Sequence, residues 1–503
     1  MANATSDIQQ EHPDFQTRNA DWIVMEDGHE GERKIKSRGS VYLPTTSGQR
    51  ALGLGNDGAG KPKEGQALYD AYIIRANYPT ILKDTANALV GVMNREPPVI
   101  TLSPGLEDME KMATSRGEPL TALIRRLQLH QLLFGRTGLF ADVDASRNLP
   151  YLVDYRARQI INWDDEVADA ETAERAISLV TVDESRNVRD GFTWEHKDKF
   201  RALRIIDGKY TVTIEDDGTE LPDIVPSIQG TTLEQIPFVF INDADLTPEL
   251  GDIPLLGLAR LALTIYRGDA DYRQALFMQG QDTLVVIGEN IDPNDPEQQL
   301  IVGAGAHINI PNENGDAKFI GADSQGLPEM RDAQQNDFDR ANNYGLQLMS
   351  KGAGAEAAET LKIKVAARTA TLVNVAETSA AGLESMLKIC AVWVGDNPDD
   401  VTVKANTDFI DESMPAAELL GLMNAKSRGA PLSTRSIHAN MRKGDLTELT
   451  FDEEMEAIDD EPPVDDSSLL GETDDDDAGG GAPGDDDEPG DGDDEPGDDD
   501  DQE

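Results

Sequence analysis

Two long helical segments separated by a short insert constrain the fold of this chain most strongly. Residues 254–279 carry apolar side chains at three- and four-residue steps, so these side chains share one face of a helix roughly 40 Å long. The apolar stripe consists of Leu258, Ala262, Ile265, Tyr272 and Leu276. Asp269 interrupts it. The segment contains no nucleophile, metal cluster or phosphate loop, so the pattern indicates a structural element.

A small β-rich insert follows this helix and precedes a second one. Its predicted strands are 283–287, 300–310 and 318–321, and a loop rich in Asp, Asn and Pro occupies 289–297. The second helix, 328–349, is polar on most faces, which suits a helix that packs on neighbours and meets water elsewhere.

A third long helix, 360–395, follows the small-residue stretch SKGAGAEAAE at 350–359. Basic residues lie around its start, namely Lys351, Lys362, Lys364 and Arg368. On spacing alone, this cluster is an ordinary solvated basic face. Because the rest of the chain is acidic, the same cluster could instead serve phosphate contact.

The N-terminal half is predicted to be a mixed α+β domain. Residues 1–64 are polar and rich in Gly, and we expect a weakly ordered arm there. Apolar residues at helical spacing then predict three helices, at 67–78, 81–93 and 120–135. The period changes to two in the predicted strands 138–144, 150–155, 176–184, 201–218 (a hairpin) and 238–243. Helices followed by a sheet favour the α+β class.

The last part of the chain is predicted to be a strand, two short helices and a tail. The strand is 400–410, and the helices are 416–427 and 434–443. Residues 451–503 contain 27 Asp and Glu and no Lys or Arg, and an approximate GDDDEPGD unit repeats in them. Such a composition cannot bury a core, so we expect disorder.

Charge and cysteine usage exclude several protein classes. The formal net charge is −52, and −25 remains on residues 1–450 once the tail is set aside. An acidic surface argues against sequence-specific duplex binding, which depends on Lys and Arg at phosphates, but it permits a protein that lets DNA pass. The single cysteine, Cys390, lies in a predicted helix and cannot form an internal disulfide. We expect no signal peptide and no membrane span.

Motifs for catalysis or cofactors are weak. Gly55 to Lys61 fit GxxxxGK, but Pro62 follows where a phosphate loop needs Ser or Thr, so a Gly-rich linker accounts for the stretch better than a nucleotide site. The six histidines are scattered without metal-ligand spacing. Asp164 and Asp165 could form an acid/base pair, although a solvated turn fits them better. We therefore expect no enzyme, no metal and no cofactor.

The order of these parts resembles the portal proteins of tailed bacteriophages. The local sequence is close to a portal-protein family that is often described only as a domain of unknown function. The resemblance covers roughly residues 65–445 and rests on YIIRANYPTILKDTANALVGVMNREPPVI (72–100), LFGRTGLFADVD (133–144), PYLVDYRARQIINWD (150–164) and ADYRQALFMQGQDTLVVIG (270–288). These motifs are structural, and such a family has no catalytic residues to transfer.

The resemblance implies a portal fold and a division into parts. They are a flexible arm (1–64), a wing (65–253), a first stem helix (254–279), a small α/β clip (280–327), a second stem helix (328–349), a tunnel loop (350–359), a tunnel helix (360–395), a wing strand (396–412), helices of a crown (413–450) and a disordered acidic tail (451–503).

The same resemblance implies where DNA and partners would bind. The tunnel loop and helix would line a DNA channel with Ser350, Lys351, Gly352, Glu356, Lys362, Lys364 and Arg368. The clip would dock the terminase and later the head–tail adaptor through Asp292, Asn294, Asp295, Glu297, Asn312 and Asn314.

The implied protein is a homododecameric ring at one capsid vertex. It would be assembled in the host bacterial cytoplasm, would contact the major capsid protein and scaffold, and would pass double-stranded DNA during packaging and ejection. An electronegative tunnel lets DNA slide, because each phosphate meets repulsion rather than a trap.

Two departures from the family pattern leave other readings open. No long helical barrel follows the crown, and the acidic tail lies outside the family core. The tail could repel packaged DNA or recruit scaffold, or it could serve only solubility. The alternative to a portal is an acidic-tailed chaperone or DNA mimic that binds basic proteins, and a third reading is an NTPase that uses residues 55–61.

Overall fold

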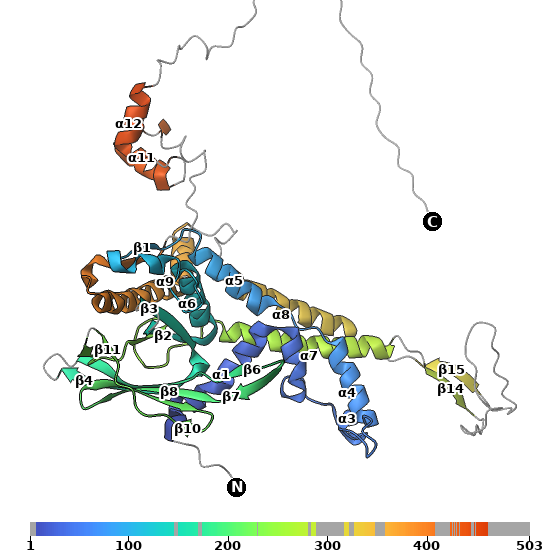
Figure 1. The fold of residues 1–503 in the computed structure, drawn as a ribbon. Coiled ribbons are helices and arrows are strands. Elements are labelled where there is room, and N and C mark those ends of the chain that lie inside the picture. Colours follow the sequence, from blue (N-terminus) through green and yellow to red (C-terminus); the bar gives the residue numbers. More distant parts are fainter. Residues whose placement is uncertain are drawn as a thin grey trace, which may run out of the picture. The chain divides into compact units, whose positions relative to one another are not determined.

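Two antiparallel sheets form the β-rich part of the chain (Figure 1). Strands β13–β2–β3 make a three-stranded sheet, and β10–β9–β8–β5–β4 make a five-stranded one. The strands of both sheets are β2 (Arg136–Asp144), β3 (Leu149–Arg156), β4 (Ile160–Asp169), β5 (Glu174–Asp183), β8 (Lys199–Ile206), β9 (Lys209–Asp216), β10 (Thr219–Glu220) and β13 (Phe238–Asn242). The hairpin predicted within 201–218 is confirmed as β8–β9, which turns at Asp207 and Gly208.

The computed structural model describes most of the chain, with gaps. The described residues are 7–144, 149–169, 174–228, 230–279, 283–287, 316–320, 326–347, 358–407, 423–424, 426, 428, 430–431, 433–443, 447 and 449–460. The chain divides into two compact units, Met1–Phe409 (unit 1) and Ile410–Glu503 (unit 2). Both helices and strands are abundant, so the mixed class predicted from the sequence is confirmed.

Helices and short strands complete unit 1. The helices are α1 (Pro13–Glu30), α2 (Glu32–Ser37), α3 (Ser47–Ala51), α4 (Glu64–Arg75), α5 (Ile81–Met93), α6 (Leu120–Phe134), α7 (Leu256–Gln279), α8 (Leu327–Gln347) and α9 (Ala358–Val394). Short 3-10 helices are η1 (Asp7–Gln9), η2 (Gly39–Val41), η3 (Pro104–Glu110), η4 (Ala157–Gln159) and η6 (Pro398–Asp400). The short strands are β1 (Val99–Thr101), β6 (Arg186–Asp190), β7 (Thr193–Lys197), β11 (Ser227–Ile228), β12 (Thr231–Thr232), β14 (Thr283–Ile287), β15 (Asp316–Ile320) and β16 (Thr402–Lys404).

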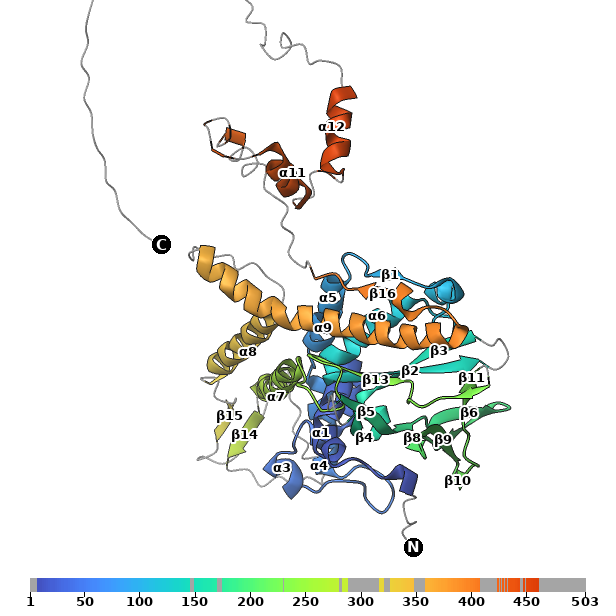
Figure 2. The ribbon, with the colours of Figure 1, turned by 90° about the vertical axis from the view of Figure 1, so that its left-hand side faces the viewer.

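Helices α6 and α9 pack on the three-stranded sheet (Figure 2). Leu123 and Leu127 of α6, Leu139 of β2, and Leu383 and Leu387 of α9 are fully buried in one apolar cluster. α6 ends at Gly135, whose left-handed backbone (φ 74°) and close approach to the carbonyl of residue 252 leave no room for a Cβ. The turn therefore leads directly from α6 into β2.

The flexible arm predicted for residues 1–64 is wrong for the described part of that stretch. α1 packs against α5, α6 and α7, and Trp22 and Met25 are 1% and 0% exposed. Phe15, Trp22 and Met25 follow at steps of seven and three residues, which places them on one narrow face of α1. The polar majority of the sequence lies on the other faces of this helix.

The strand predicted at 400–410 is shorter than expected. β16 covers only Thr402–Lys404 and pairs antiparallel with β1, while residues 408–410 lie outside the described part. β1 itself has three residues, because Pro97 and Pro98 precede it and supply no backbone N–H for a longer ladder.

In unit 2, α11 (Thr434–Lys443) lies where the second crown helix is predicted. The tail prediction is wrong over residues 451–460, which form α12 (Phe451–Asp460). Thr450 begins this helix with a capping box, because its hydroxyl accepts from the amide of Glu453 and the Glu453 carboxylate accepts from the amide of Thr450. Phe451 packs edge-on against His438 of α11. Most of the helix predicted at 416–427, and residues 461–503, lie outside the described part.

No helix among the described residues is long and apolar enough to cross a membrane.

Candidate functional site

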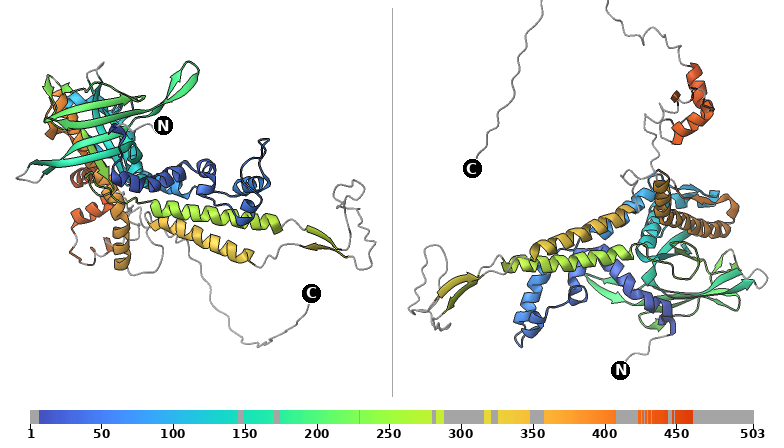
Figure 3. Two further views of the ribbon diagram at one scale, coloured as in Figure 1. Left: turned by 90° about the horizontal axis from the view of Figure 1, so that it is seen from below. Right: turned by 180° about the vertical axis from the view of Figure 1, so that it is seen from behind.

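Helices α7 and α8 run antiparallel side by side in unit 1 (Figure 3). At their inner end, the Tyr344 hydroxyl of α8 donates to the carbonyl of Pro254, 3.1 Å away. Gly257 of α7 lies under the Tyr344 ring, where an added Cβ would be 3.0 Å from the hydroxyl oxygen. The helices therefore approach closely at this end because α7 offers no side chain there.

Asp269, which interrupts the predicted apolar stripe of α7, is buried where α7, α8 and the connection between α4 and α5 meet. Its carboxylate accepts from the amide of Asn77 before α5 (2.7 Å), from Arg273 one turn along α7 (2.7 Å) and from Gln334 of α8 (3.1 Å). The side chain is 9% exposed. A carboxylate with three donors is satisfied when buried, so Asp269 fixes α8 and the connection between α4 and α5 against α7.

Replacing Asp269 with alanine should reduce the free energy of unfolding by about 1–3 kcal/mol, because the Asn77 amide and the Gln334 side chain lose their acceptor. The matched control is Asp339→Ala on α8, whose exposed carboxylate accepts, among the described residues, from Gln335 one turn earlier on the same helix. We expect that control to change stability by less than about 0.5 kcal/mol. Denaturant unfolding of both variants measures the difference, and equal losses would contradict the role given to Asp269.

The predicted stripe of α7 is buried at one end and exposed at the other. Leu258, Ala262 and Ile265 are at most 1% exposed, whereas Tyr272 is half-buried and Leu276 is 42% exposed. The outer end also exposes Phe277 and Met278, at 39% and 54%. The apolar stripe of α7 is thus part of the core at its inner end and part of the surface at its outer end.

Helix α4 braces this outer end from one side. Tyr72 donates to Asp271, and Arg75 donates to Gln274 at 2.7 Å. The Arg75 guanidinium also lies over the Phe277 ring, 3.6 Å from its centroid. From Asp271 onward, α7 is therefore held to α4 by polar contacts and by the stacking of Arg75 on Phe277.

Strands β14 and β15 follow α7 and precede α8, and they pair antiparallel from Thr283 opposite Ile320 to Ile287 opposite Asp316. They fall within the predicted insert. The strand predicted at 300–310 and the predicted docking residues lie outside the described part, namely Asp292, Asn294, Asp295, Glu297, Asn312 and Asn314.

Of the predicted DNA-facing residues, three fall on a described element. Lys362, Lys364 and Arg368 lie in the N-terminal part of α9, and Lys364 and Arg368 are one helical turn apart. The others lie outside the described residues, namely Ser350, Lys351, Gly352 and Glu356.

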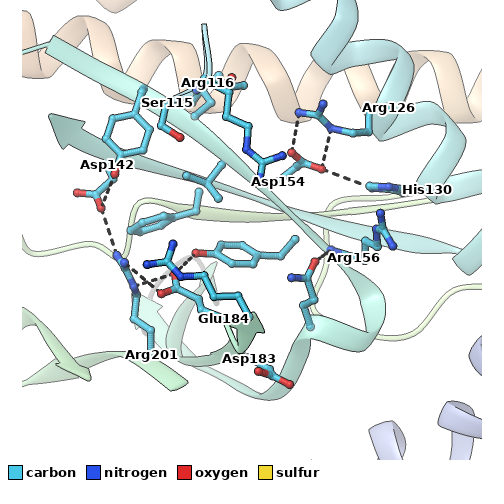
Figure 4. Close-up of a pocket in the computed structure, with 18 of the residues that line it drawn as sticks. Ser115, Arg116, Arg126, His130, Asp142, Asp154, Arg156, Asp183, Glu184 and Arg201 are labelled. Carbon is cyan, nitrogen blue, oxygen red and sulfur yellow. Dashed lines mark hydrogen bonds and ion pairs between the residues drawn. The ribbon is translucent and has the colours of Figure 1, made fainter. Parts of the chain in front are cut away.

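A polar cavity of about 750 Å³ lies between the two sheets (Figure 4). Basic and acidic side chains both line its wall. The charged side chains that line it are Glu26, Arg116, Glu118, Arg126, Asp142, Asp154, Arg156, Arg158, Asp183, Glu184, Arg186, Lys199 and Arg201. The basic and acidic side chains are nearly equal in number here, although the chain as a whole is strongly acidic.

Arg201 connects the two sheets across this cavity. Figure 4 shows it between Asp142 and Glu184, at 3.2 and 3.1 Å. Glu184 also accepts from Tyr155 (2.7 Å) and pairs with Lys199 (2.8 Å). Burial alone would raise the pKa of Glu184, but Arg201, Lys199 and Tyr155 hold it below its ordinary value. The carboxylate is therefore ionised and fully engaged.

A second group on the same wall surrounds Asp154. Arg126 of α6 donates to both of its oxygens, at 2.8 and 3.0 Å, and also to Glu118. His130, one turn further along α6, places Nδ1 3.7 Å from Asp154. Burial lowers the pKa of His130 to about 4, and Asp154 opposes this effect only in part. The imidazole is therefore neutral near pH 7.

The charged side chains of this cavity form ion pairs with one another. Their carboxylates are neutralised by guanidinium groups, so the cavity joins α6 and both sheets electrostatically. In the part of the chain that the structure describes, no cluster of three His, Cys, Asp or Glu side chains is arranged to hold a metal ion.

The GxxxxGK stretch and the paired carboxylates also have structural roles. Asp57 accepts from the amides of Ala59 and Lys61 at 2.9 and 2.8 Å, so its carboxylate occupies the donors that a phosphate would need. The turn predicted at Asp164 and Asp165 is wrong, because both lie in β4, where Asp165 pairs with Arg175 of β5.

Sequence reasoning missed the β6–β7 hairpin. Its strands pair only with each other among the described residues, and Phe192 and Trp194 are 98% and 67% exposed. The signal was present as a glycine, Gly191, followed by the alternating aromatic residues Phe192 and Trp194.

Comparison with known proteins gives one family model and several solved structures. Residues 254–394 match a model described as a domain of unknown function (DUF4055). No curated protein matches the chain. Among solved structures, the chain is similar to chains in the virion of a native gene transfer agent (GTA) particle, in the neck of an empty GTA particle computed with C6 symmetry, and in the neck of a native GTA particle computed with C12 symmetry. Each of these has 14% identity and a TM-score of 0.36, and each alignment covers 71% of this chain and 88% of the other.

Proposed function

We propose that this chain is the portal protein of a phage-like particle, a ring at one capsid vertex through which double-stranded DNA is packaged and ejected. One observation carries the proposal. Two long antiparallel helices, α7 and α8, enclose a small β-hairpin in sequence, and the 37-residue helix α9 follows them. This is the order of stem, clip, stem and tunnel helix that the sequence resemblance implies.

The surface of α7 supports assembly into a ring. Its outer end exposes the consecutive residues Leu276, Phe277 and Met278, while Leu258, Ala262 and Ile265 at its inner end are buried. In a ring of identical subunits, such a surface is buried against the neighbouring copy. The neighbouring copy, rather than another part of the same chain, would then cover the apolar side chains at the outer end of α7.

The charge of the chain supports a conduit rather than a DNA-binding protein. With −25 on residues 1–450, duplex DNA would meet net repulsion and could slide. Lys362, Lys364 and Arg368 on α9 would then be the exceptions that touch the DNA backbone without reading bases. Residues 350–359 would form the loop in front of them.

In this proposal, partners engage the segment between α7 and α8. Residues 280–327 would dock the terminase during packaging and the head–tail adaptor afterwards. The ATP hydrolysis that drives DNA would belong to the terminase, so the portal itself would be no enzyme and need no cofactor. The wing would face the major capsid protein.

Native mass spectrometry combined with two-dimensional electron-microscopy averages tests the proposal. We expect a closed ring with a central channel, and a dodecamer of 54.7-kDa chains would have a mass of about 656 kDa. Met278→Asp places a charge on the exposed end of α7 and should weaken the ring. Met112→Asp, at a site that is 46% exposed in the loop after η3, is the matched control and should leave the ring intact.

A compact dimer or pentamer without a channel would contradict the portal proposal and favour the acidic-tailed chaperone. Equal effects of the two Met variants would mean that the outer end of α7 is not a contact between copies.

A further inference from the structure

The polar cavity between the two sheets contains guanidinium groups that its own carboxylates do not use (Figure 4). Seven Lys or Arg and six Asp or Glu line it. Five of the basic side chains form ion pairs with five of the carboxylates. Arg116, Arg186 and Asp183 remain, and none of them forms an ion pair with another described residue. Two cations and one carboxylate of the cavity are therefore still available.

Arg116 is held at the cavity by a short turn of the backbone. Its amide and the amide of Glu118 both donate to the Thr114 hydroxyl, at 3.3 Å. The carbonyl before this turn accepts from an amide of β3 at 2.8 Å, so the turn is attached to the three-stranded sheet. The Glu118 carboxylate pairs with Arg126 at 2.9 Å. Figure 4 shows the Arg116 side chain extending from the turn into the space between the sheets.

Arg186 comes from the five-stranded sheet. It follows the turn after β5, in which the Asp183 carboxylate accepts from the amide of Ser185 at 2.8 Å. The Ser185 hydroxyl in turn accepts from the amide of Lys199 in β8, 3.1 Å away. Because β5 and β8 are neighbours in one sheet, this turn has a fixed position. Each sheet thus supplies one unpaired guanidinium group to the cavity.

The rest of the lining suits a small molecule. A volume of about 750 Å³ lies within the range of cavities that hold metabolites and cofactors. Phe140, Leu152 and Tyr155 are almost fully buried and supply an apolar part of the lining. Ser115, beside Arg116, adds a hydroxyl group.

The free groups of this cavity favour an anion. A guanidinium group presents pairs of N–H donors that match two oxygens of a phosphate or a carboxylate. The chain as a whole repels anions, since residues 1–450 carry a formal charge of −25, so any attraction must come from the cavity itself. Asp183 opposes this attraction, but it is one carboxylate against two guanidinium groups.

We propose that the cavity binds a small oxyanion with at least two negative charges, held between Arg116 and Arg186. Organic phosphates and polycarboxylates share this chemistry. The bound anion would connect the two sheets in addition to the ion pairs of Arg201. The proposal does not depend on ring assembly, because the whole cavity lies within one chain.

Isothermal titration calorimetry on the full-length protein tests the site, with pyrophosphate and citrate as separate probes at an ionic strength matched with sodium chloride. We expect one binding event per chain, and the tighter of the two probes distinguishes a phosphate site from a carboxylate site. Arg116→Ala and Arg186→Ala should each weaken binding roughly 10- to 100-fold, as expected for the loss of a hydrogen bond between charged groups. Both side chains are exposed and unpaired among the described residues, so both variants should fold like wild type.

Two further variants separate the site from general charge effects. Asp183→Asn keeps the oxygen that accepts from Ser185 and removes the opposing charge, so it should tighten binding about 3-fold. Arg33→Ala removes an exposed arginine of α2 that does not line the cavity, and it should leave the affinity unchanged.

Three results would overturn the proposal. The first is the absence of binding heat for both probes with wild type. The second is wild-type affinity in both Arg116→Ala and Arg186→Ala, which would place the anion elsewhere. The third is a loss in Arg33→Ala as large as in the cavity variants, which would show that the net charge of the chain, rather than this cavity, governs binding.

Discussion

Replacing Trp22 with alanine should lower the free energy of unfolding by about 3–5 kcal/mol, the range for truncation of a buried tryptophan. Trp22 is 1% exposed and packs 5.6 Å from Phe15, centroid to centroid. Its indole N–H donates to the carbonyl of Phe134 at 2.9 Å, at the end of α6. The alanine variant therefore loses apolar contacts and leaves a buried carbonyl without its donor.

Denaturant unfolding followed by circular dichroism, at one fixed protein concentration, measures this loss. Val41→Ala is the matched control, because Val41 belongs to the same N-terminal stretch but is 68% exposed. We expect that control to change stability by no more than about 0.5 kcal/mol. Similar values for both variants would mean that α1 is not part of the core and that residues 1–64 behave as a flexible arm.

That expectation failed for a physical reason. Only three side chains of α1 enter the core as large apolar groups, and the remaining residues are mostly polar and charged. Because so few residues of α1 are large and apolar, the average hydrophobicity of the segment is as low as that of a loop. The stability of α1 comes from the large area of Trp22 and from a hydrogen bond to α6, neither of which appears in a periodicity pattern.

Strand β4 escaped prediction because its sequence contains the pair Asp164 and Asp165, which is typical of turns. Trp163 of the same strand is buried and covers the guanidinium of Arg136, 4.4 Å from its centroid. Arg175 across the ladder pairs with Asp165. The neighbouring strands therefore supply partners that make a charged sequence compatible with a sheet.

The long helices were predictable because their pattern is sustained over many residues. α5 has the predicted limits 81–93, and α7, α8 and α9 begin and end within two residues of their predicted limits. The candidate site could be predicted from the sequence only in part. The sequence indicated the helix pair and the basic start of α9, but the charged cavity joins residues from α6, β3, β5 and β8 that no sequence spacing relates.

A histidine in that cavity should make the protein sensitive to mild acid. His130 is 5% exposed and lies beside Phe134, with Asp154, Arg126, Arg156 and His29 as its charged or titratable neighbours. Burial lowers its pKa from an ordinary value of 6.5 to about 4. The unfolded chain therefore binds a proton at this residue between pH 6.5 and 4, whereas the folded chain does not.

The sign of the effect follows from this difference. Stability that is fully present above pH 6.5 is lost as the pH falls, and the loss is complete near pH 4. A shift of this size corresponds to about 3 kcal/mol, at roughly 1.4 kcal/mol for each pH unit. Glu184, whose pKa is held below its ordinary value, adds a further loss in the same direction at lower pH.

Denaturant unfolding from pH 7 to pH 4 on wild type and His130→Gln isolates the histidine contribution. Glutamine does not titrate, so the variant should be less stable than wild type at pH 7 by the cost of its packing defect, and the gap should narrow by about 3 kcal/mol at pH 4. His196→Gln is the control for the substitution itself, because that imidazole is 63% exposed and lies outside the cavity. A constant gap between His130→Gln and wild type would show that His130 titrates normally in the folded chain, and that the cavity admits a charged imidazole.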